Sequence, residues 1–70
     1  MFIYLLTQYI NTGYDTFDSC VVVANNEAEA QKITPANHGW ALPENVYVKY
    51  IGETNQYTKP TLILASFNAG

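Results

Sequence analysis

The chain contains one thiol and one imidazole, the two side chains that could together carry nucleophilic catalysis. A Cys20–His38 dyad needs a thiolate on Cys20, with His38 as its base and an acid to orient the imidazole. Cys20, however, lies within the apolar run "SCVVVA", where burial raises a thiol pKa instead of lowering it. One cysteine and one histidine are also too few for a structural zinc site. The sequence therefore predicts neither an enzyme nor a cofactor or metal site.

A polar and aromatic stretch, "NTGYDTFDS" (Asn11–Ser19), separates two apolar runs. Its two carboxylates, Asp15 and Asp18, suggest a calcium loop only weakly, because such loops need further oxygen ligands. Gly13 permits a positive φ, so one interpretation is an ordered hairpin loop whose aromatic side chains tuck under a sheet. The other is a contact surface, since long loops often carry binding residues. The candidate contact residues are Asn11, Thr12, Tyr14, Asp15, Thr16, Phe17 and Asp18.

Three further aromatic residues are binding candidates outside that stretch. His38 and Trp40 lie in the irregular segment Thr34–Asn45, and Tyr57 lies in the polar loop Gly52–Thr61. His38 could shuttle a proton or, with Trp40, form a stacking site. A tryptophan that caps the core beside a helix end is the simpler interpretation. Tyr57 adds a phenol group to a loop of mainly uncharged polar residues.

Four short segments have the composition of strands, and they must position these candidates. In the first segment Ile3 and Leu5 fall on one side and Tyr4 and Leu6 on the other, because side chains alternate along a strand. Apolar residues on both sides indicate a strand that is covered on both faces. The predicted strands are Phe2–Gln8, Ser19–Ala24, Val46–Ile51 and Thr61–Phe67.

The stretch "NNEAEAQKI", between the second and third strands, carries the helix signal. Asn26 is a favourable N-cap, and Glu29 three residues later completes a capping-box pattern. Pro35 is expected to end the helix, because the residue before a proline avoids the helical region. A helix of about eight residues is unstable alone, so Ala30 and Ile33 must pack against the sheet.

The order of elements predicts a single α+β domain over residues 1–70. It is a small four-stranded sheet with one short helix on one face, in ββαββ order. One helix covers only part of one face, yet 49% of the residues are apolar and only 13% are charged. A chain of this size buries only about 60% of its unfolded surface. We therefore expect the open face to be buried by another chain, in a homodimer or higher homo-oligomer.

The charge distribution argues against nucleic acid as a partner. The formal net charge is −3, there is no arginine, and the three lysines lie far apart in sequence. Affinity for nucleic acid depends largely on clustered cations. No apolar run approaches the ~18 residues of a membrane span, which predicts a cytoplasmic protein without membrane contact. The six tyrosines favour binding over chemistry, because tyrosine is enriched at protein interfaces.

The segments "YLLTQYINTGYDTFDSCVVVANNEAEAQKI" and "LASFNAG" resemble a group of small proteins encoded by bacteriophages and prophages. Within them, "GYDTFDS" and "ASFNAG" are the more distinctive pieces. The resemblance implies an accessory factor in the host cell cytoplasm that blocks a host defence system. Such factors act by binding a host protein or by sequestering a nucleotide signal.

Two functions therefore stay open at the level of sequence. The first is a homo-oligomeric interaction protein whose loops occupy a surface on a host protein and inhibit it. The second is a sponge for a small nucleotide-like ligand, with sites between subunits near Tyr14 and Trp40, because bases stack on aromatic rings. The lack of arginine counts against the second function when the ligand carries phosphates.

Overall fold

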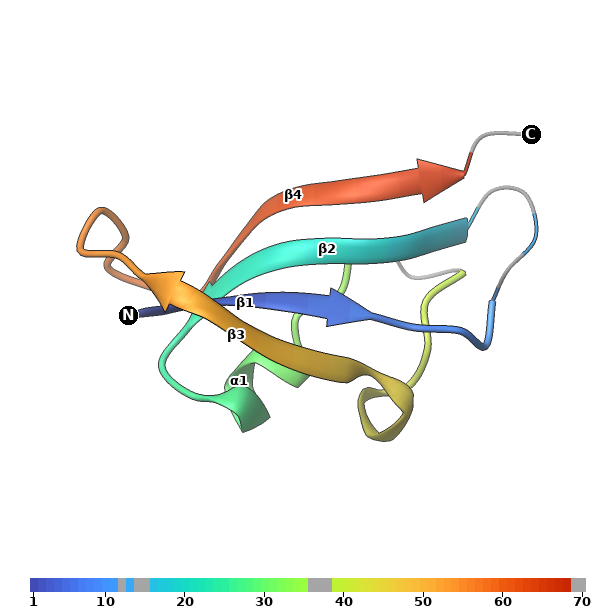
Figure 1. The fold of residues 1–70 in the computed structure, drawn as a ribbon, viewed down its shortest axis with the longest axis horizontal. Coiled ribbons are helices and arrows are strands. Elements are labelled where there is room, and N and C mark those ends of the chain that lie inside the picture. Colours follow the sequence, from blue (N-terminus) through green and yellow to red (C-terminus); the bar gives the residue numbers. More distant parts are fainter. Residues whose placement is uncertain (12, 14–15, 36–38, 69–70) are drawn as a thin grey trace.

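In the part of the chain that the structure describes, four strands form one antiparallel sheet in the order β3-β1-β2-β4 (Figure 1). This computed structural model describes residues 1–11, 13, 16–35 and 39–68, the side chain at position 68 excepted. The predicted α+β fold with ββαββ order is confirmed. The elements are β1 (Phe2–Thr7), β2 (Thr16–Ala24), α1 (Glu27–Gln31), the 3₁₀ helix η1 (Pro43–Asn45), β3 (Tyr47–Glu53) and β4 (Thr61–Asn68).

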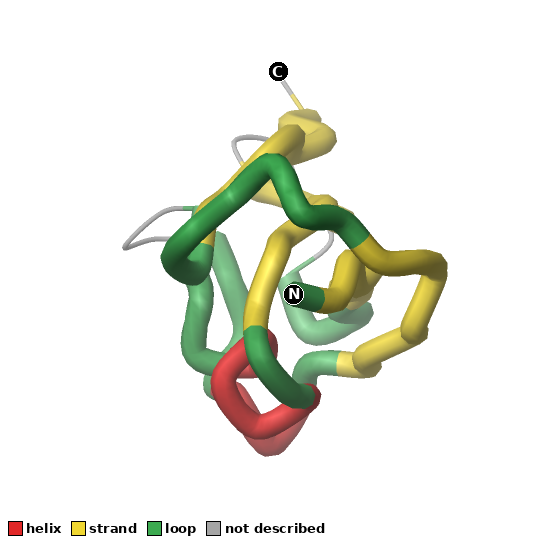
Figure 2. Tube along the Cα trace, turned by 90° about the vertical axis from the view of Figure 1, so that its left-hand side faces the viewer, coloured by secondary structure: helices red, strands yellow, loops and turns green. Residues whose placement is uncertain are grey.

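The core lies between the sheet and α1. Strand alternation turns Tyr4 and Leu6 of β1 and their partners Val22 and Cys20 of β2 to this side, where all four are buried. The helix and the segments around η1 close the layer, and Figure 2 shows α1 to one side of the strands. The remaining core residues are Ala24, Ala30, Ala41 and Val46, with Ile33, Trp40, Val48 and Ala65 packed against them.

Helix α1 begins as the sequence predicts and ends earlier. The Asn26 side chain accepts a hydrogen bond from the Glu29 N–H at 2.8 Å, and the Glu29 carboxylate accepts from the Asn25 N–H at 2.8 Å. Lys32 is the C-cap, and its N–H donates to the Glu29 carbonyl, which tightens the last turn. The helix therefore ends at Gln31, before the position that Pro35 would restrict. The predicted packing of Ala30 and Ile33 against the sheet is confirmed.

The strand order differs from a chain of simple hairpins. β3 and β4 lie at opposite edges of the sheet, so the polar loop that joins them crosses the end of the sheet and does not form a hairpin turn. Figure 2 looks onto this end. Mutual hydrogen bonds between Met1 and Thr54 extend the β1–β3 pairing to the start of the crossing segment. β2 and β3 are not neighbours, because β1 lies between them.

β2 is longer than predicted and begins at Thr16 instead of Ser19. Phe17 pairs with Phe67 and Ser19 with Ser66, so Asp18 is an extra residue that forms a β-bulge against β4. A bulge changes the direction in which side chains point, and no pattern of turn residues reveals its position in a sequence. None of the described helices is long and apolar enough to cross a lipid bilayer.

Candidate functional site

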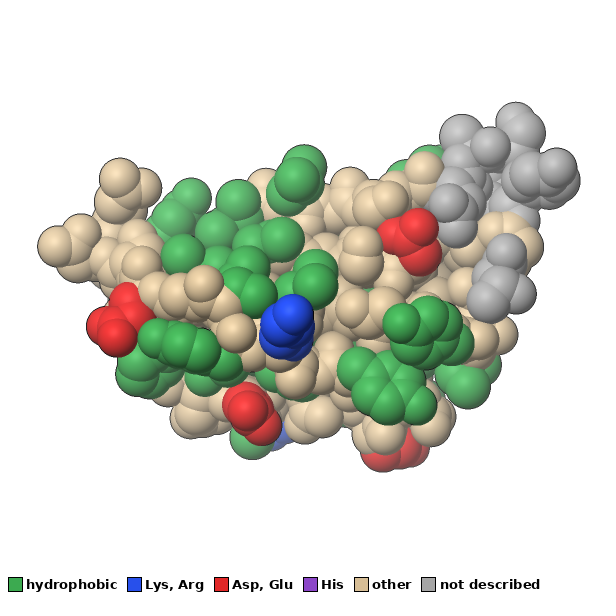
Figure 3. All heavy atoms as spheres, in the orientation of Figure 1, with side chains coloured by type: hydrophobic (Ala, Val, Ile, Leu, Met, Phe, Trp, Pro, Cys, Tyr) green, Lys and Arg blue, Asp and Glu red, His purple; other side chains and the backbone are tan. Residues whose placement is uncertain are grey.

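The sheet face opposite α1, here called the open face, carries apolar side chains that no described helix covers. By register, Ile3 and Leu5 of β1 lie on it with Val21 of β2, Tyr47 of β3 and Leu64 of β4. No described helix covers this face, and Figure 3 views the molecule from this side and shows hydrophobic groups gathered over the strands. The sequence expectation that the helix covers one face only is confirmed.

Exposure on the open face is greatest at its margins. Leu64 is 67% exposed and Tyr47 is 65% exposed. Tyr9, whose ring centroid lies 5.6 Å from that of Tyr47, is 69% exposed. Exposed apolar patches on soluble proteins mark sites of interaction when they are large and contiguous. Lys49 opposes Leu5 on this face and is exposed, so a single cation sits among the apolar groups.

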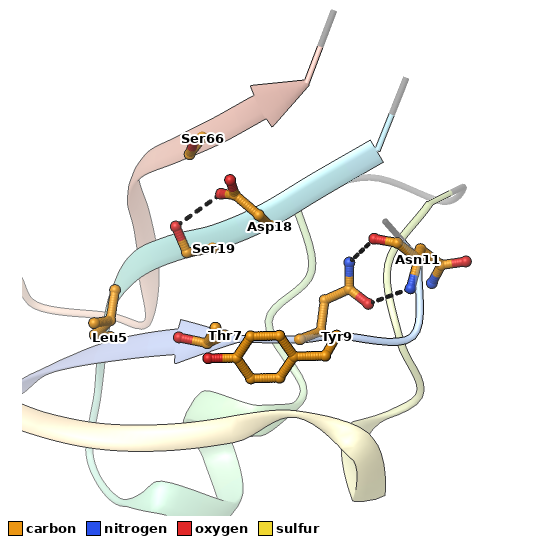
Figure 4. A pocket seen from close by; sticks show the side chains of 8 residues that line it. Leu5, Thr7, Tyr9, Asn11, Asp18, Ser19 and Ser66 are labelled. Atoms are coloured by element: carbon orange, nitrogen blue, oxygen red, sulfur yellow. Dashed lines mark hydrogen bonds between the residues drawn. The ribbon is translucent and has the colours of Figure 1, made fainter. Parts of the chain in front are cut away.

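A hollow of about 460 Å³ lies at one end of the open face, beside the β1–β2 loop (Figure 4). Hydroxyl groups dominate its polar lining, and Asp18 provides its carboxylate. The Ser19 hydroxyl donates a hydrogen bond to Asp18 Oδ1 at 3.0 Å. The hollow can therefore accept hydrogen bonds from a cation or a polar group. Its lining residues are Leu5, Thr7, Gln8, Tyr9, Asn11, Asp18, Ser19 and Ser66.

Gln8 fixes the shape of this end of the sheet. Its side chain is 2% exposed and continues the core-facing series of Tyr4 and Leu6. Nε2 donates to the carbonyls of Asn11 and Phe17, both at 2.7 Å. Oε1 accepts from the N–H groups of Ile10 at 3.1 Å and Asn11 at 2.9 Å. One buried amide thus satisfies four backbone groups and holds the start of the loop against β2.

The structure separates the candidates of the β1–β2 stretch. Asn11 and Asp18 line the hollow. Thr16 donates its hydroxyl to the Gly13 carbonyl at 2.7 Å. Phe17 is half-buried, and its ring centroid lies 4.8 Å from that of Phe67 on β4, so it packs along the sheet. The predictions for Thr12, Tyr14, Asp15 and His38 fall outside the described residues.

Trp40 and Tyr57 lie away from the hollow. Trp40 packs against the core on the helix side, which agrees with the simpler interpretation of a tryptophan beside the helix end. Its indole Nε1 is buried and has no hydrogen-bond partner among the described residues. Tyr57 is half-buried in the segment that crosses from β3 to β4, at the other end of the sheet. The candidates therefore do not converge on one pocket.

Sequence reasoning missed Thr7, Gln8, Tyr9, Ser19 and Ser66 as parts of one site. They come from three strands and a loop, and only the register brings them together. The sequence gives one sign of the role of Gln8: a polar residue stands in line with the core-facing side chains of β1, where a side chain is expected to be buried. Among the described residues, no group of three or more His, Cys, Asp or Glu side chains could hold a metal ion.

Burial raises the pKa of the Cys20 thiol from 9.0 to about 11. The thiol is therefore protonated at neutral pH, as the apolar strand predicts. We expect iodoacetamide to modify Cys20 slowly in the folded protein at pH 8 and rapidly in urea, as followed by mass spectrometry. Rapid modification of the native protein would contradict this burial.

The same shift gives stability a pH dependence. Because the folded pKa is the higher one, the neutral thiol contributes stability that is fully present below pH 9 and is lost as the pH rises through about 11. Urea unfolding between pH 8 and pH 11 is expected to show a steeper fall in the free energy of unfolding for the wild type than for Cys20→Ala. Parallel curves for the two proteins would show that the shift is absent.

The fold and surface place this chain among α+β proteins built on a sheet covered by a helix on one side only. Comparisons with known protein families, with curated proteins and with solved structures found no match.

Proposed function

We propose that this chain is a non-enzymatic interaction protein that works as a homodimer in the bacterial cytoplasm, with the open face buried between the two copies. The observation that carries the proposal is the exposure of Leu64, Tyr47 and Tyr9 on or beside a sheet face that no described helix covers. Burying such side chains is favourable by about 25 cal/mol for each Å² of apolar surface removed from water. In the monomer these side chains stay exposed to water, so the stabilisation from burying them is not gained.

The outline of the molecule sets an upper limit on the size of the open face. The molecule measures 36 by 21 Å along its two longer axes, which gives an outline of about 750 Å², of the same order as the ~800 Å² that each partner buries in a standard interface. Two-fold dimers are also the commonest homo-oligomers. Sheet faces pack well on one another at about 10 Å separation, so the pair forms a two-layer core.

The charge of the open face is compatible with self-association. Lys49 and Asp18 carry opposite charges on the same side of the sheet, so two copies do not present surfaces of one strong sign to each other. Like-charge contacts in an interface are costly, and their scarcity here favours a copy of the same chain over a strongly charged partner.

The resemblance to small phage-encoded proteins extends the proposal to a target. We propose that the dimer binds and inhibits a host defence protein. The ends of the two packed sheets remain available for this contact. A sponge for a nucleotide-like ligand is the alternative from sequence, and the same experiment separates it.

Native mass spectrometry of protein purified from a bacterial host tests this function. We expect a particle of twice the chain mass without additional small mass. A dimer that retains a small molecule through purification would favour the sponge instead. A monomer at concentrations of tens of micromolar would refute the proposed homodimer, and the open face would then have to bind a different protein.

A further inference from the structure

We propose that Lys49 of each copy inserts its ammonium group into the hollow of the other copy, where it pairs with Asp18. This inference rests on the proposed homodimer and names the contact that fixes how the two faces meet. The pairing occurs twice in the dimer, because a two-fold interface repeats every contact with the roles of the copies exchanged.

The hollow is suited to an ammonium group. Asp18 is half-buried, and of its two carboxylate oxygens only Oδ1 makes a hydrogen bond to another described residue, the Ser19 hydroxyl. An ionised carboxylate can accept about four hydrogen bonds, so most of its capacity is free. The hydroxyls of Thr7 and Ser66 line the same space and can accept from the two remaining N–H groups of a lysine. Neither lysine nor arginine lines the hollow.

Lys49 needs such a partner once the open face is covered. It lies on β3 opposite Leu5, whose side chain also lines the hollow, and it makes no ion pair within the described part of the chain. In the free protein the ammonium is exposed to water. Covering the face without a partner for this charge would leave it buried and unpaired, which is strongly unfavourable. The long lysine stem can instead carry the charge to the polar end of the face.

The Lys49–Asp18 pair also fixes the relative orientation of the two copies, which apolar contacts alone do not fix. Hydrophobic contacts on a sheet face are non-directional, so many relative rotations of two copies bury similar areas. An acid at one end and a lysine across from Leu5 single out the arrangement in which both pairs form at once. The inference therefore gives the proposed dimer a defined geometry.

A charge exchange tests the pairing. The dimer dissociation constant is measured by sedimentation equilibrium for the wild type, Asp18→Lys, Lys49→Asp and the double variant. We expect each single change to weaken the dimer by about 100-fold or more, because it places like charges together twice, and the double variant to recover to within about 10-fold of the wild type. Glu27→Lys and Lys32→Asp make the same charge changes at exposed positions at the two ends of α1, on the other side of the sheet, and are expected to leave the constant unchanged.

The outcomes separate this inference from the proposed function. If the wild type dimerises and the single variants bind as tightly as it does, the pairing is wrong and the homodimer stands. If the single variants weaken the dimer and the double variant stays weak, the two residues do not face each other and the pairing is also wrong. A monomeric wild type refutes both proposals. Circular dichroism confirms folding, and Asp18→Asn removes the charge with little change of shape should Asp18→Lys fail to fold.

Discussion

Leu64→Asp is expected to convert the dimer into a monomer, with a dissociation constant at least about 1,000-fold higher. Leu64 is an exposed leucine of β4 on the open face, and a two-fold interface buries it twice. An aspartate there would place two carboxylates without partners in an apolar layer. The folded monomer is hardly affected, since surface substitutions usually change its stability by within about 0.5 kcal/mol. Sedimentation equilibrium gives the constant, and urea unfolding of the monomeric protein checks its stability.

The chain offers a matched control for this change. Leu42, which precedes η1, is 64% exposed against 67% for Leu64, and it lies outside the open face. Leu42→Asp makes the same chemical change at nearly the same exposure and is expected to leave the dimer intact. Equal weakening by both substitutions would indicate an effect of charge in general, and weakening by Leu42→Asp alone would move the interface to the helix side.

Gln8→Leu is expected to lower the free energy of unfolding by about 3 kcal/mol. Leucine fills a similar volume, so the loss comes from the four hydrogen bonds of the amide and hardly from packing. The N–H groups of Ile10 and Asn11 and the carbonyls of Asn11 and Phe17 would lose their partner. Since a chain of this length has only about 3–10 kcal/mol of stability, this is a large fraction of the total.

Urea unfolding followed by circular dichroism measures the effect of Gln8→Leu. Gln56→Leu is the control, because Gln56 is exposed and its side chain makes none of the described hydrogen bonds. It is expected to change stability by less than about 0.5 kcal/mol. If Gln8→Leu is as stable as the wild type, water or a rearranged loop must satisfy these backbone groups, and Gln8 does not determine the shape of the hollow.

The fold class could be predicted from sequence because its signals are local. Short runs that are apolar on both sides mark β1 and β2, and Asn26 and Glu29 mark the start of α1. Strand order depends on pairing between distant residues, which composition does not encode. The crossing from β3 to the far edge therefore had no local signal, nor did the bulge at Asp18 that lengthens β2.

The sequence predicted that one sheet face is uncovered, but it did not predict which residues form the hollow on that face. The excess of apolar residues on both sides of the strands predicts an uncovered face, and the structure has one. The hollow needs the register, because Ser66 of β4 meets Ser19 of β2 only through pairing. Trp40 was a binding candidate by residue type, and only the structure shows that it packs against the core on the helix side, away from the hollow.

Hydroxyl-radical footprinting of the wild type, at concentrations well above and well below the dimer dissociation constant, tests the central claim most directly. The claim is that the open face is the surface buried between two copies. We expect oxidation of Leu64, Tyr47 and Tyr9 to fall several-fold at the higher concentration, while oxidation of Leu42 stays constant. Unchanged oxidation of the first three residues in a protein that does dimerise, or protection of Leu42 in their place, would contradict it.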